Sequence, residues 1–321
     1  MEKNETKTAN IGKDHPLKPV LSRRDFIVGS TVALAGAVSS VAALTPLLQA
    51  QEVPPADELF RQHYQRISAD DKKMIFRRLE QRLEQEYGIR PVISDPPPID
   101  GVVFAYSLNI GRCIGCRKCV YACMKENNLS RQPQVQYIRV LKMKKEGRGI
   151  NLETSVHDYP AEEAGDKNYY YMPVQCQQCS NPPCVKVCPV KATWQERDGL
   201  VVVDYNWCIG CRYCEAACPY HARRFNFTKP RVPSQELNPN MGYLSNRPRY
   251  MGVMEKCTFC LHRTRVGRYP ACVEVCPTGT RKFGNLKDPD SEVRKIIEKE
   301  RVYVLKEDLG TVPKFYYVFA K

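Results

Sequence analysis

The sequence lacks the motifs that usually indicate chemistry on an organic substrate. Its 321 residues contain no paired-carboxylate motif, no nucleophile elbow and no glycine-rich phosphate loop. Beyond residue 50 no stretch reaches 18 apolar residues, so we expect a mature chain without a transmembrane helix. No cysteine lies outside a few dense groups, and any special chemistry must therefore be sought in those groups.

The chain has 16 cysteines, and every one belongs to a run of four. Such grouped spacing points to inorganic ligation rather than to packing. Runs one to four are, in order, Cys113, Cys116, Cys119 and Cys123; Cys176, Cys179, Cys184 and Cys188; Cys208, Cys211, Cys214 and Cys218; and Cys257, Cys260, Cys272 and Cys276.

The spacing within the runs favours cubane iron–sulfur clusters over zinc. Runs one and three read C-x2-C-x2-C-x3-C, run two has four residues in its middle step, and run four has eleven. A tetrahedral zinc site needs two CxxC pairs and has no use for a third cysteine three residues on. Three closely spaced thiolates suit three corners of a [4Fe–4S] cluster, and in bacterial ferredoxins the fourth cysteine of such a run ligates the other cluster of a pair. We predict four [4Fe–4S] clusters, with zinc or one [3Fe–4S] cluster as alternatives.

The net charge of +14, from 49 Lys and Arg against 35 Asp and Glu, needs a different interpretation once clusters are considered. A basic balance often indicates nucleic acid or a membrane surface. Thiolate-ligated clusters are anionic, and four of them at about −2 each would offset roughly 8 units of the excess. We interpret the basic surplus largely as counter-charge and expect no nucleic-acid partner.

Residues 1–50 resemble a twin-arginine export signal. Arg23 and Arg24 are adjacent, and an apolar, small-residue run follows from Gly29 to Ala50. This export route carries folded proteins, which suits a chain assembled around a cofactor. A disulfide framework, the other exported cysteine-rich class, would show varied spacings rather than four near-copies of one run. Cleavage near Ala50 and retention of the run as an anchor both stay open.

Residues 51–100 are predicted to be a helical extension and a linker. Ser68 is a suitable N-cap for a helix that starts at Ala69, and Gly88 is a suitable stop. The proline-rich stretch 91–98 predicts a stiff linker. The extension either packs on the main body or docks a partner subunit.

The remaining segments predict an α+β protein. Between runs two and three, Asp198-Gly199 separates two strand-like stretches and indicates a hairpin. Residues 144–168 are polar and charged, which predicts an exposed excursion. Strands are expected at 102–108, 136–143, 169–171, 192–195, 200–205, 302–305 and 315–320, with a helix at 288–300. We assign 101–285 to the core and 286–321 to a C-terminal helix and strands.

The four runs in this order resemble the four-cluster iron–sulfur subunits of membrane-linked oxidoreductases. The matching stretches are CIGCRKCVYACMKENN, CQQCSNPPCVKVCPVKAT, CIGCRYCEAACPYHARRF and EKCTFCLHRTRVGRYPACVEVCPTGTRKFGNL, within residues 102–285. That family includes electron-transfer subunits of DMSO, polysulfide and tetrathionate reductases and the similar subunit of the transmembrane complexes of sulfate reducers. It implies two ferredoxin-like units with loop insertions, one holding runs one and four and the other runs two and three.

The resemblance also implies crossed ligation, in which the last cysteine of each run serves the other cluster of its unit. The four implied ligand sets are Cys113, Cys116, Cys119 and Cys276; Cys176, Cys179, Cys184 and Cys218; Cys208, Cys211, Cys214 and Cys188; and Cys257, Cys260, Cys272 and Cys123. We refer to them as the first to fourth sets.

The function implied by the resemblance is electron relay, not catalysis. The protein would carry electrons between a quinone-reactive integral membrane subunit and a periplasmic redox partner, either a molybdopterin enzyme or a multihaem cytochrome. We expect it on the periplasmic face of the cytoplasmic membrane. A partner would attach it there, because the sequence ends in FYYVFAK without a membrane helix. Alternatives are the iron–sulfur subunit of a sulfate- or sulfite-reduction transmembrane complex, a catalytic subunit, and a zinc-binding structural protein.

Several residues beside the runs are candidates for secondary roles. The five polar ones either tune potentials or move protons near a quinone, or they support the ligands and compensate cluster charge. They are His221, His262, Arg223, Arg224 and Arg263. Trp194, Tyr213 and Phe259 are expected to shield clusters from water.

Overall fold

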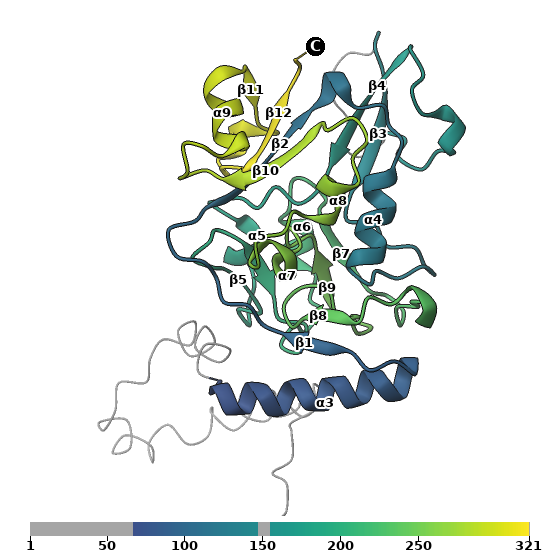
Figure 1. Ribbon diagram of the computed structural model, residues 1–321, viewed down its shortest axis with the longest axis vertical. Coiled ribbons are helices and arrows are strands. Elements are labelled where there is room, and N and C mark those ends of the chain that lie inside the picture. Colours follow the sequence, from purple (N-terminus) through teal and green to yellow (C-terminus); the bar gives the residue numbers. More distant parts are fainter. Residues whose placement is uncertain (1–66, 147–154, 321) are drawn as a thin grey trace, which may run out of the picture. The chain divides into compact units, whose positions relative to one another are not determined.

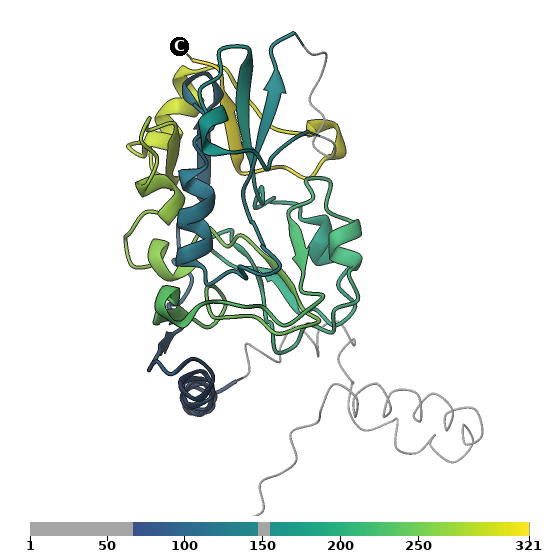
Figure 2. The ribbon, with the colours of Figure 1, turned by 90° about the vertical axis from the view of Figure 1, so that its right-hand side faces the viewer.

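The computed structural model describes residues 67–146 and 155–320, all within the compact unit Pro55–Lys321. The predicted signal peptide and residues 51–66 of the predicted extension lie outside the described residues. Figures 1 and 2 show that short strands and helical turns fill the middle of this unit, between one group of longer elements at each end. A four-stranded sheet with helix α9 forms one end, and helix α3 with strands β1 and β8 forms the other.

Helix α3, Ala69–Tyr87, has the caps that the sequence predicts. The Ser68 side chain accepts a hydrogen bond from the backbone N–H of Asp71, and Gly88 ends the helix in the left-handed region with φ of 70°. Leu79 and Leu83 are its buried residues. Strand β1, Val92–Ser94, then pairs in parallel with β8, Asn240–Gly242.

The largest sheet joins segments from both ends of the described chain, in the order β10-β2-β12-β11. Strand β2, Phe104–Asn109, pairs antiparallel with β10, Arg281–Asn285, and parallel with β12, Phe315–Val318; β11 is Val302–Tyr303. Tyr106 of β2 is fully buried and stacks on Phe315 with ring centroids 4.7 Å apart. The C-terminal strand is thus an interior member of this sheet.

Three antiparallel pairs of strands complete the β-structure. The predicted hairpin at Asp198-Gly199 is confirmed, because Thr193 pairs with Val203 across it and Gly199 has φ of 79°. The pairs are β3, Arg139–Lys144, with β4, Tyr169–Val174; β5, Thr193–Gln195, with β6, Val201–Val203; and β7, Arg223–Phe225, with β9, Met254–Lys256.

Short helices carry most of the later cysteines of the runs. The third and fourth cysteines of every run are four residues apart, which is about one α-helical turn, so they lie on one side of that turn. These helices are α4, Lys118–Glu126; α5, Pro183–Lys186; α6, Tyr213–Ala216; and α8, Ala271–Glu274. Helix α7, Leu261–Thr264, contains no cysteine and begins directly after Cys260. The other helices are α9, Glu292–Lys299, and the 3-10 turns Ile110–Arg112, Ala161–Glu163, Ser234–Glu236 and Glu307–Leu309.

The described part of the excursion between runs one and two is mostly exposed, as predicted, and Tyr159 is the exception. Tyr159 is 5% exposed; its hydroxyl donates to the backbone oxygen of Gly115 at 2.8 Å, and its own backbone oxygen accepts from Arg117 at 2.7 Å. Residues 147–154 of the excursion lie outside the described residues. The prediction of an exposed segment is therefore wrong for Tyr159, whose aromatic ring covers the loop of run one.

Gly115 and Gly210 occupy the same position in the two CIGC stretches and face the same restriction. Their φ angles are 72° and 73°, in the region where side chains are strained. A Cβ at Gly115 would lie 2.2 Å from the Tyr171 ring, and one at Gly210 would lie 2.2 Å from the backbone oxygen of Gly252. Only glycine allows these two loops to lie so close to the neighbouring strand and backbone.

We expect Gly115→Ala to destabilise the iron-loaded protein more than Gly101→Ala. Both glycines have positive φ, which costs alanine about 1–2 kcal/mol, but a Cβ at Gly101 has no atom within 4 Å. The collision with Tyr171 should add roughly 1–3 kcal/mol. Thermal unfolding of both variants measures the difference in stability. Equal unfolding temperatures would show that the short distance between Gly115 and the Tyr171 ring does not restrict residue 115 to glycine.

Candidate functional site

The structure brings cysteines of run one together with those of run four. Cys113 lies near Cys119 and Cys276, and burial raises the pKa of Cys113 to about 11. Cys123, the last cysteine of run one, is fully buried beside Cys257 and Cys260 of run four. The last cysteine of each run thus lies among the earlier cysteines of the other.

Runs two and three have the same relation. A cavity is lined by Cys208, Cys211 and Cys214 of run three together with Cys188, the last cysteine of run two. In return, Cys218 of run three lies near Cys176 and Cys184 of run two. Of the 16 thiols, Cys211 is the exposed one, whereas the others are buried or partly buried.

Thiols of the two pairs of runs also lie near each other. Cys257 of run four lies near Cys176 of run two. Within the pairs, Cys119 of run one is near Cys272 of run four, and Cys184 of run two is near Cys214 of run three. The neighbouring groups of thiols are therefore ordered run one, run four, run two, run three.

Polar groups that sequence reasoning missed donate hydrogen bonds to these sulfurs. The Nδ2 of Asn127 lies 3.5 Å from Cys123 Sγ and 3.6 Å from Cys260 Sγ, so one amide contacts two runs. Backbone N–H groups also reach sulfur, from Phe259 to Cys257 and from Met254 to Cys208. Such donors favour a thiolate over a thiol.

Four buried cations lie close to the runs. In the described part of the chain, no carboxylate lies within ion-pair distance of Arg223, Lys256, Arg281 or Lys314, and each is at most 2% exposed. Burial lowers the pKa of Lys314 to about 8, while Cys179 and Cys176 act in the opposite direction. A buried charge without a partner is costly. These side chains therefore fit an anionic group held by the cysteines.

Arg223 gives the clearest test of that fit. It lines the cavity of Cys188, Cys208, Cys211 and Cys214, and its Nε and Nη1 are buried without a hydrogen-bonding partner among the described residues. Unsatisfied buried donors cost about 1–3 kcal/mol each. An acceptor-rich group such as the sulfides of a cluster suits these donors.

Several buried thiols have raised pKa values, as expected for ligands that need a metal to ionise. Burial raises the pKa of Cys179 to about 12 and that of Cys214 to about 11, so without metal these groups stay protonated at neutral pH. Cys276 differs. Burial acts to raise its pKa, but hydrogen bonds with Thr280 and Thr278 bring it below the usual value.

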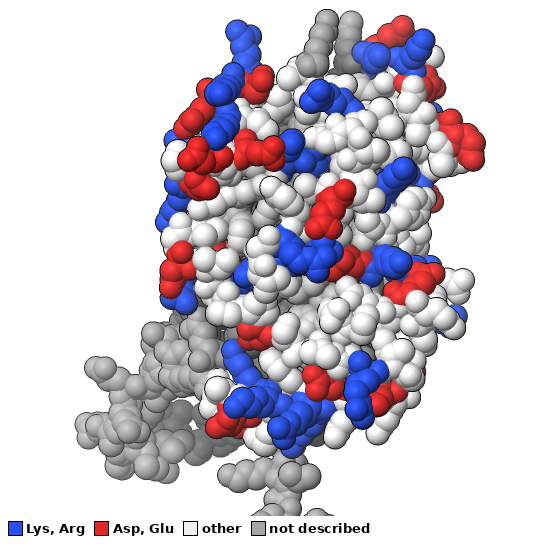
Figure 3. Space-filling model, viewed as in Figure 1, with Lys and Arg blue, Asp and Glu red and all other residues white. Residues whose placement is uncertain are grey.

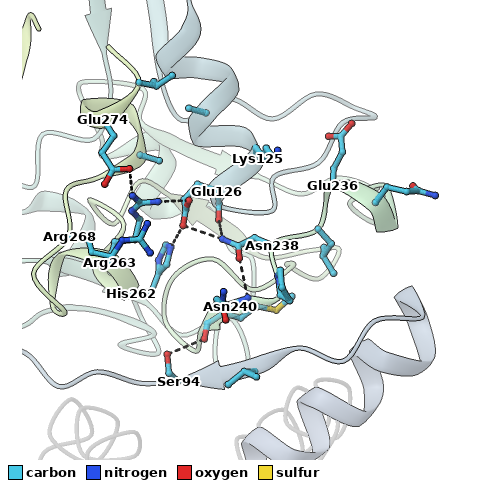
Figure 4. Close-up of a pocket in the computed structure, with 18 residues that line it drawn as sticks. Ser94, Lys125, Glu126, Glu236, Asn238, Asn240, His262, Arg263, Arg268 and Glu274 are labelled. Carbon is cyan, nitrogen blue, oxygen red and sulfur yellow. Dashed lines mark hydrogen bonds and ion pairs between the residues drawn. The ribbon is translucent and has the colours of Figure 1, made fainter. Parts of the chain in front are cut away.

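The predicted flanking residues fall into different environments. His221 is exposed, whereas the His262 side chain is 6% exposed and its Nε2 lies 2.8 Å from Glu126 Oε1. Burial lowers the pKa of His262. Arg263 pairs with Glu126 and Glu274, so its charge is compensated by carboxylates rather than by thiols (Figure 4).

The other predicted flanking residues differ in how deeply they lie. The Nε of Arg224 donates to the backbone oxygen of Gln136 at 3.1 Å. Phe259 is buried and Trp194 is partly buried, as shielding requires. Tyr213 is 64% exposed, so its ring lies at the surface rather than in the interior.

The pocket beside run four is a hollow of about 750 Å³ with both signs of charge on its wall. Figure 4 shows the Glu126 carboxylate where His262, Arg263 and Asn238 meet, each joined to it by a dashed line. On the outer face in Figure 3, basic and acidic side chains are interspersed.

Two negative findings apply to the described ranges, 67–146 and 155–320. No helix there combines the length and apolarity of a membrane span. No three or more His, Cys, Asp or Glu side chains converge there on a point that suits a single metal ion.

Two family models match the region of the runs. Both are described as a 4Fe-4S dicluster domain, one over residues 112–192 and the other over residues 167–233 and 243–286. Together they include all 16 cysteines. The residues of these domains form the mixed helices and strands described above, which is consistent with a ferredoxin-like fold.

Curated relatives extend the same result over most of the chain. One component of selenate reductase, from Mesobacillus selenatarsenatis, is 33% identical over 92% of this chain and 97% of its own length. Hdr-like menaquinol oxidoreductase iron-sulfur subunit 1 of Archaeoglobus fulgidus is 39% identical over 67% of this chain and 82% of its own length. One component of tetrathionate reductase, from Salmonella typhimurium, is 36% identical over 67% of this chain and 72% of its own length. The chain therefore belongs to the iron–sulfur electron-transfer subunits of membrane-associated oxidoreductases, the family that its cysteine runs predict.

Proposed function

We propose that this chain holds four [4Fe–4S] clusters in the four crossed ligand sets given above. The observation that carries the proposal is the cavity of the third set, where Cys188 lies with Cys208, Cys211 and Cys214 although run two contributes it. When bound, each cluster accepts and releases an electron, and four in succession make a relay. The protein holds the ligands, supplies donors to their sulfurs and places buried cations beside them.

The proposed order of the sets is first, fourth, second and third. It follows the neighbouring thiols, from Cys119 and Cys272 through Cys257 and Cys176 to Cys184 and Cys214. We assign the sets to two ferredoxin-like units. Runs two and three flank the β5–β6 hairpin in one unit. In the other unit run one follows β2 and run four precedes β10, the strand that pairs with β2.

The two ends of this order are the proposed points of electron entry and exit. At the third set Cys211 is exposed, and Ile209, Tyr213 and Phe227 expose 42%, 64% and 64% of their surface around it. At the first set Ile114 is 43% exposed. We propose that the redox partners cover these exposed apolar side chains at the two ends.

The partners and location are proposed from the relatives and from the first 50 residues. The relative from Archaeoglobus fulgidus is named as a subunit of a menaquinol oxidoreductase and the relative from Salmonella typhimurium as a subunit of tetrathionate reductase. We propose an integral membrane subunit that reacts with quinone at one end and a molybdopterin enzyme or multihaem cytochrome at the other. The twin-arginine signal would place the assembly on the periplasmic face of the membrane.

The fully loaded protein should contain about 16 iron atoms per chain, because four cubane clusters have four irons each. Iron and acid-labile sulfide assays on anaerobically purified protein measure this directly. Twelve or fewer irons in a fully loaded sample, or zinc in their place, would defeat the four-cluster assignment.

Cys218→Ser should alter the same cluster as Cys176→Ser and leave the cluster altered by Cys211→Ser unchanged. The reason is that Cys218 lies beside Cys176 and Cys184, although it belongs to run three. Electron paramagnetic resonance during redox titration compares the three variants. If the Cys218→Ser spectrum matched that of Cys211→Ser instead, the ligation would be local rather than crossed.

Replacing both Arg23 and Arg24 with lysine should keep the folded, iron-loaded protein in the cytoplasm. The double substitution retains the two positive charges, so it tests the arginine pair rather than the basic region. Fractionation followed by immunoblotting measures export. Unchanged export of the double variant would contradict the twin-arginine assignment.

A further inference from the structure

An arginine stands at the same position after the last cysteine in runs three and four. Arg223 follows Cys218 by five residues and Arg281 follows Cys276 by five. Arg223 is the first residue of strand β7, and Arg281 is the first residue of strand β10. The sequence repeat is therefore also a structural one.

Arg223 lies between runs two and three. It is 2% exposed and close to Cys184 and Cys214, the third cysteine of each of these runs. Its Nη2 donates to Thr193 Oγ1 at 2.9 Å. Thr193 follows Cys188 by five residues, so the equivalent positions after both runs touch each other.

Arg281 has the same relation to runs one and four. It is also 2% exposed, its Nη2 lies 3.2 Å from Cys119 Sγ, and Cys272 is a close neighbour. These two cysteines are again the third of their runs. The Nη1 of Arg281 bonds Tyr106 Oη at 3.0 Å, and that hydroxyl lies 3.4 Å from Cys272 Sγ.

Each arginine thus lies close to one proposed ligand from each of the two sets in its pair. Burial acts to lower the pKa of both guanidinium groups, but the surrounding thiols raise it above the usual value. Among the described residues neither arginine has a carboxylate partner. A guanidinium stays charged at all physiological pH, so both sites carry a permanent positive charge in the interior.

We propose that Arg223 and Arg281 are equivalent positioning residues, each of which stabilises the reduced state of both clusters in its pair. The inference rests on the proposed function, because it requires clusters in the four sets. Reduction adds one negative charge to a cluster while the arginine charge is unchanged. The reduced form therefore gains more from the arginine than the oxidised form, and the midpoint potential rises. Arg223 raises the midpoint potentials of the second and third clusters, and Arg281 raises those of the first and fourth clusters.

Lys282 provides a matched control for Arg281. It is the next residue of strand β10, it also carries one positive charge, and its side chain is 37% exposed and pairs with Glu292. Successive side chains of a strand point to opposite faces. Lys282→Gln thus removes the same charge from the same strand, on the side that faces water.

The test compares Arg223→Gln, Arg281→Gln, the two Arg→Lys variants and Lys282→Gln in the full-length protein. After iron has been counted, redox titration followed by electron paramagnetic resonance gives each midpoint, with signals assigned by Cys→Ser variants of each set. Arg281→Gln should shift the first and fourth clusters to lower potential by at least a tenfold change in the oxidised-to-reduced ratio, about 59 mV for one electron. The second and third clusters should not move.

Arg223→Gln should give the reciprocal pattern. Each Arg→Lys variant should have cluster midpoint potentials close to those of the wild-type protein, because the positive charge is kept. Lys282→Gln should have the same midpoint potentials as the wild-type protein. Full iron content with unchanged potentials in the Gln variants would overturn the proposal. Loss of iron from both the Gln and the Lys variants would also overturn it, because the arginines would then serve assembly. A wild-type protein without iron would instead defeat the proposed function itself.

Discussion

The structure depends on one electrostatic constraint: the cysteine sulfurs must be charged to hold iron, and they lie where charge is costly. Burial raises the pKa of Cys113 and Cys214 to about 11, because the interior disfavours the charged thiolate. The interior contains four buried cations with no carboxylate within ion-pair distance in the described part of the chain, Arg223, Lys256, Arg281 and Lys314. Since thiolates and clusters are anionic, the same buried charges that would destabilise an empty protein stabilise a loaded one.

The backbone meets this constraint with short, repeated devices. One helical turn separates the third and fourth cysteines of each run, and a glycine with positive φ allows the CIGC loops to approach neighbouring groups closely. Side chains then link runs that are distant in sequence, as Asn127 does for Cys123 and Cys260. The result is an ordered row of thiol groups from run one to run three, which is the arrangement that an electron relay requires.

The sequence predicts the local features of this arrangement better than the distant ones. The α3 caps at Ser68 and Gly88 and the hairpin at Asp198-Gly199 depend on neighbouring residues, and they are confirmed. The place of β12 beside β2 depends on residues more than two hundred positions apart, and no local pattern specifies it. The contacts of Asn127 and Tyr159 are equally non-local. The sequence shows that Arg223 and Arg281 each follow the last cysteine of a run by five residues. Only the structure shows that Arg281 lies beside Cys119 and Cys272.

Crossed ligation in four sets is the central claim, and anomalous X-ray scattering at the iron edge from crystals of the loaded protein tests it most directly. We predict four iron sites in a row, each bound by three cysteines of one run and the last cysteine of its partner run. The row should follow the order of the first, fourth, second and third sets. A cluster bound by all four cysteines of a single run, such as Cys208, Cys211, Cys214 and Cys218, would contradict crossed ligation.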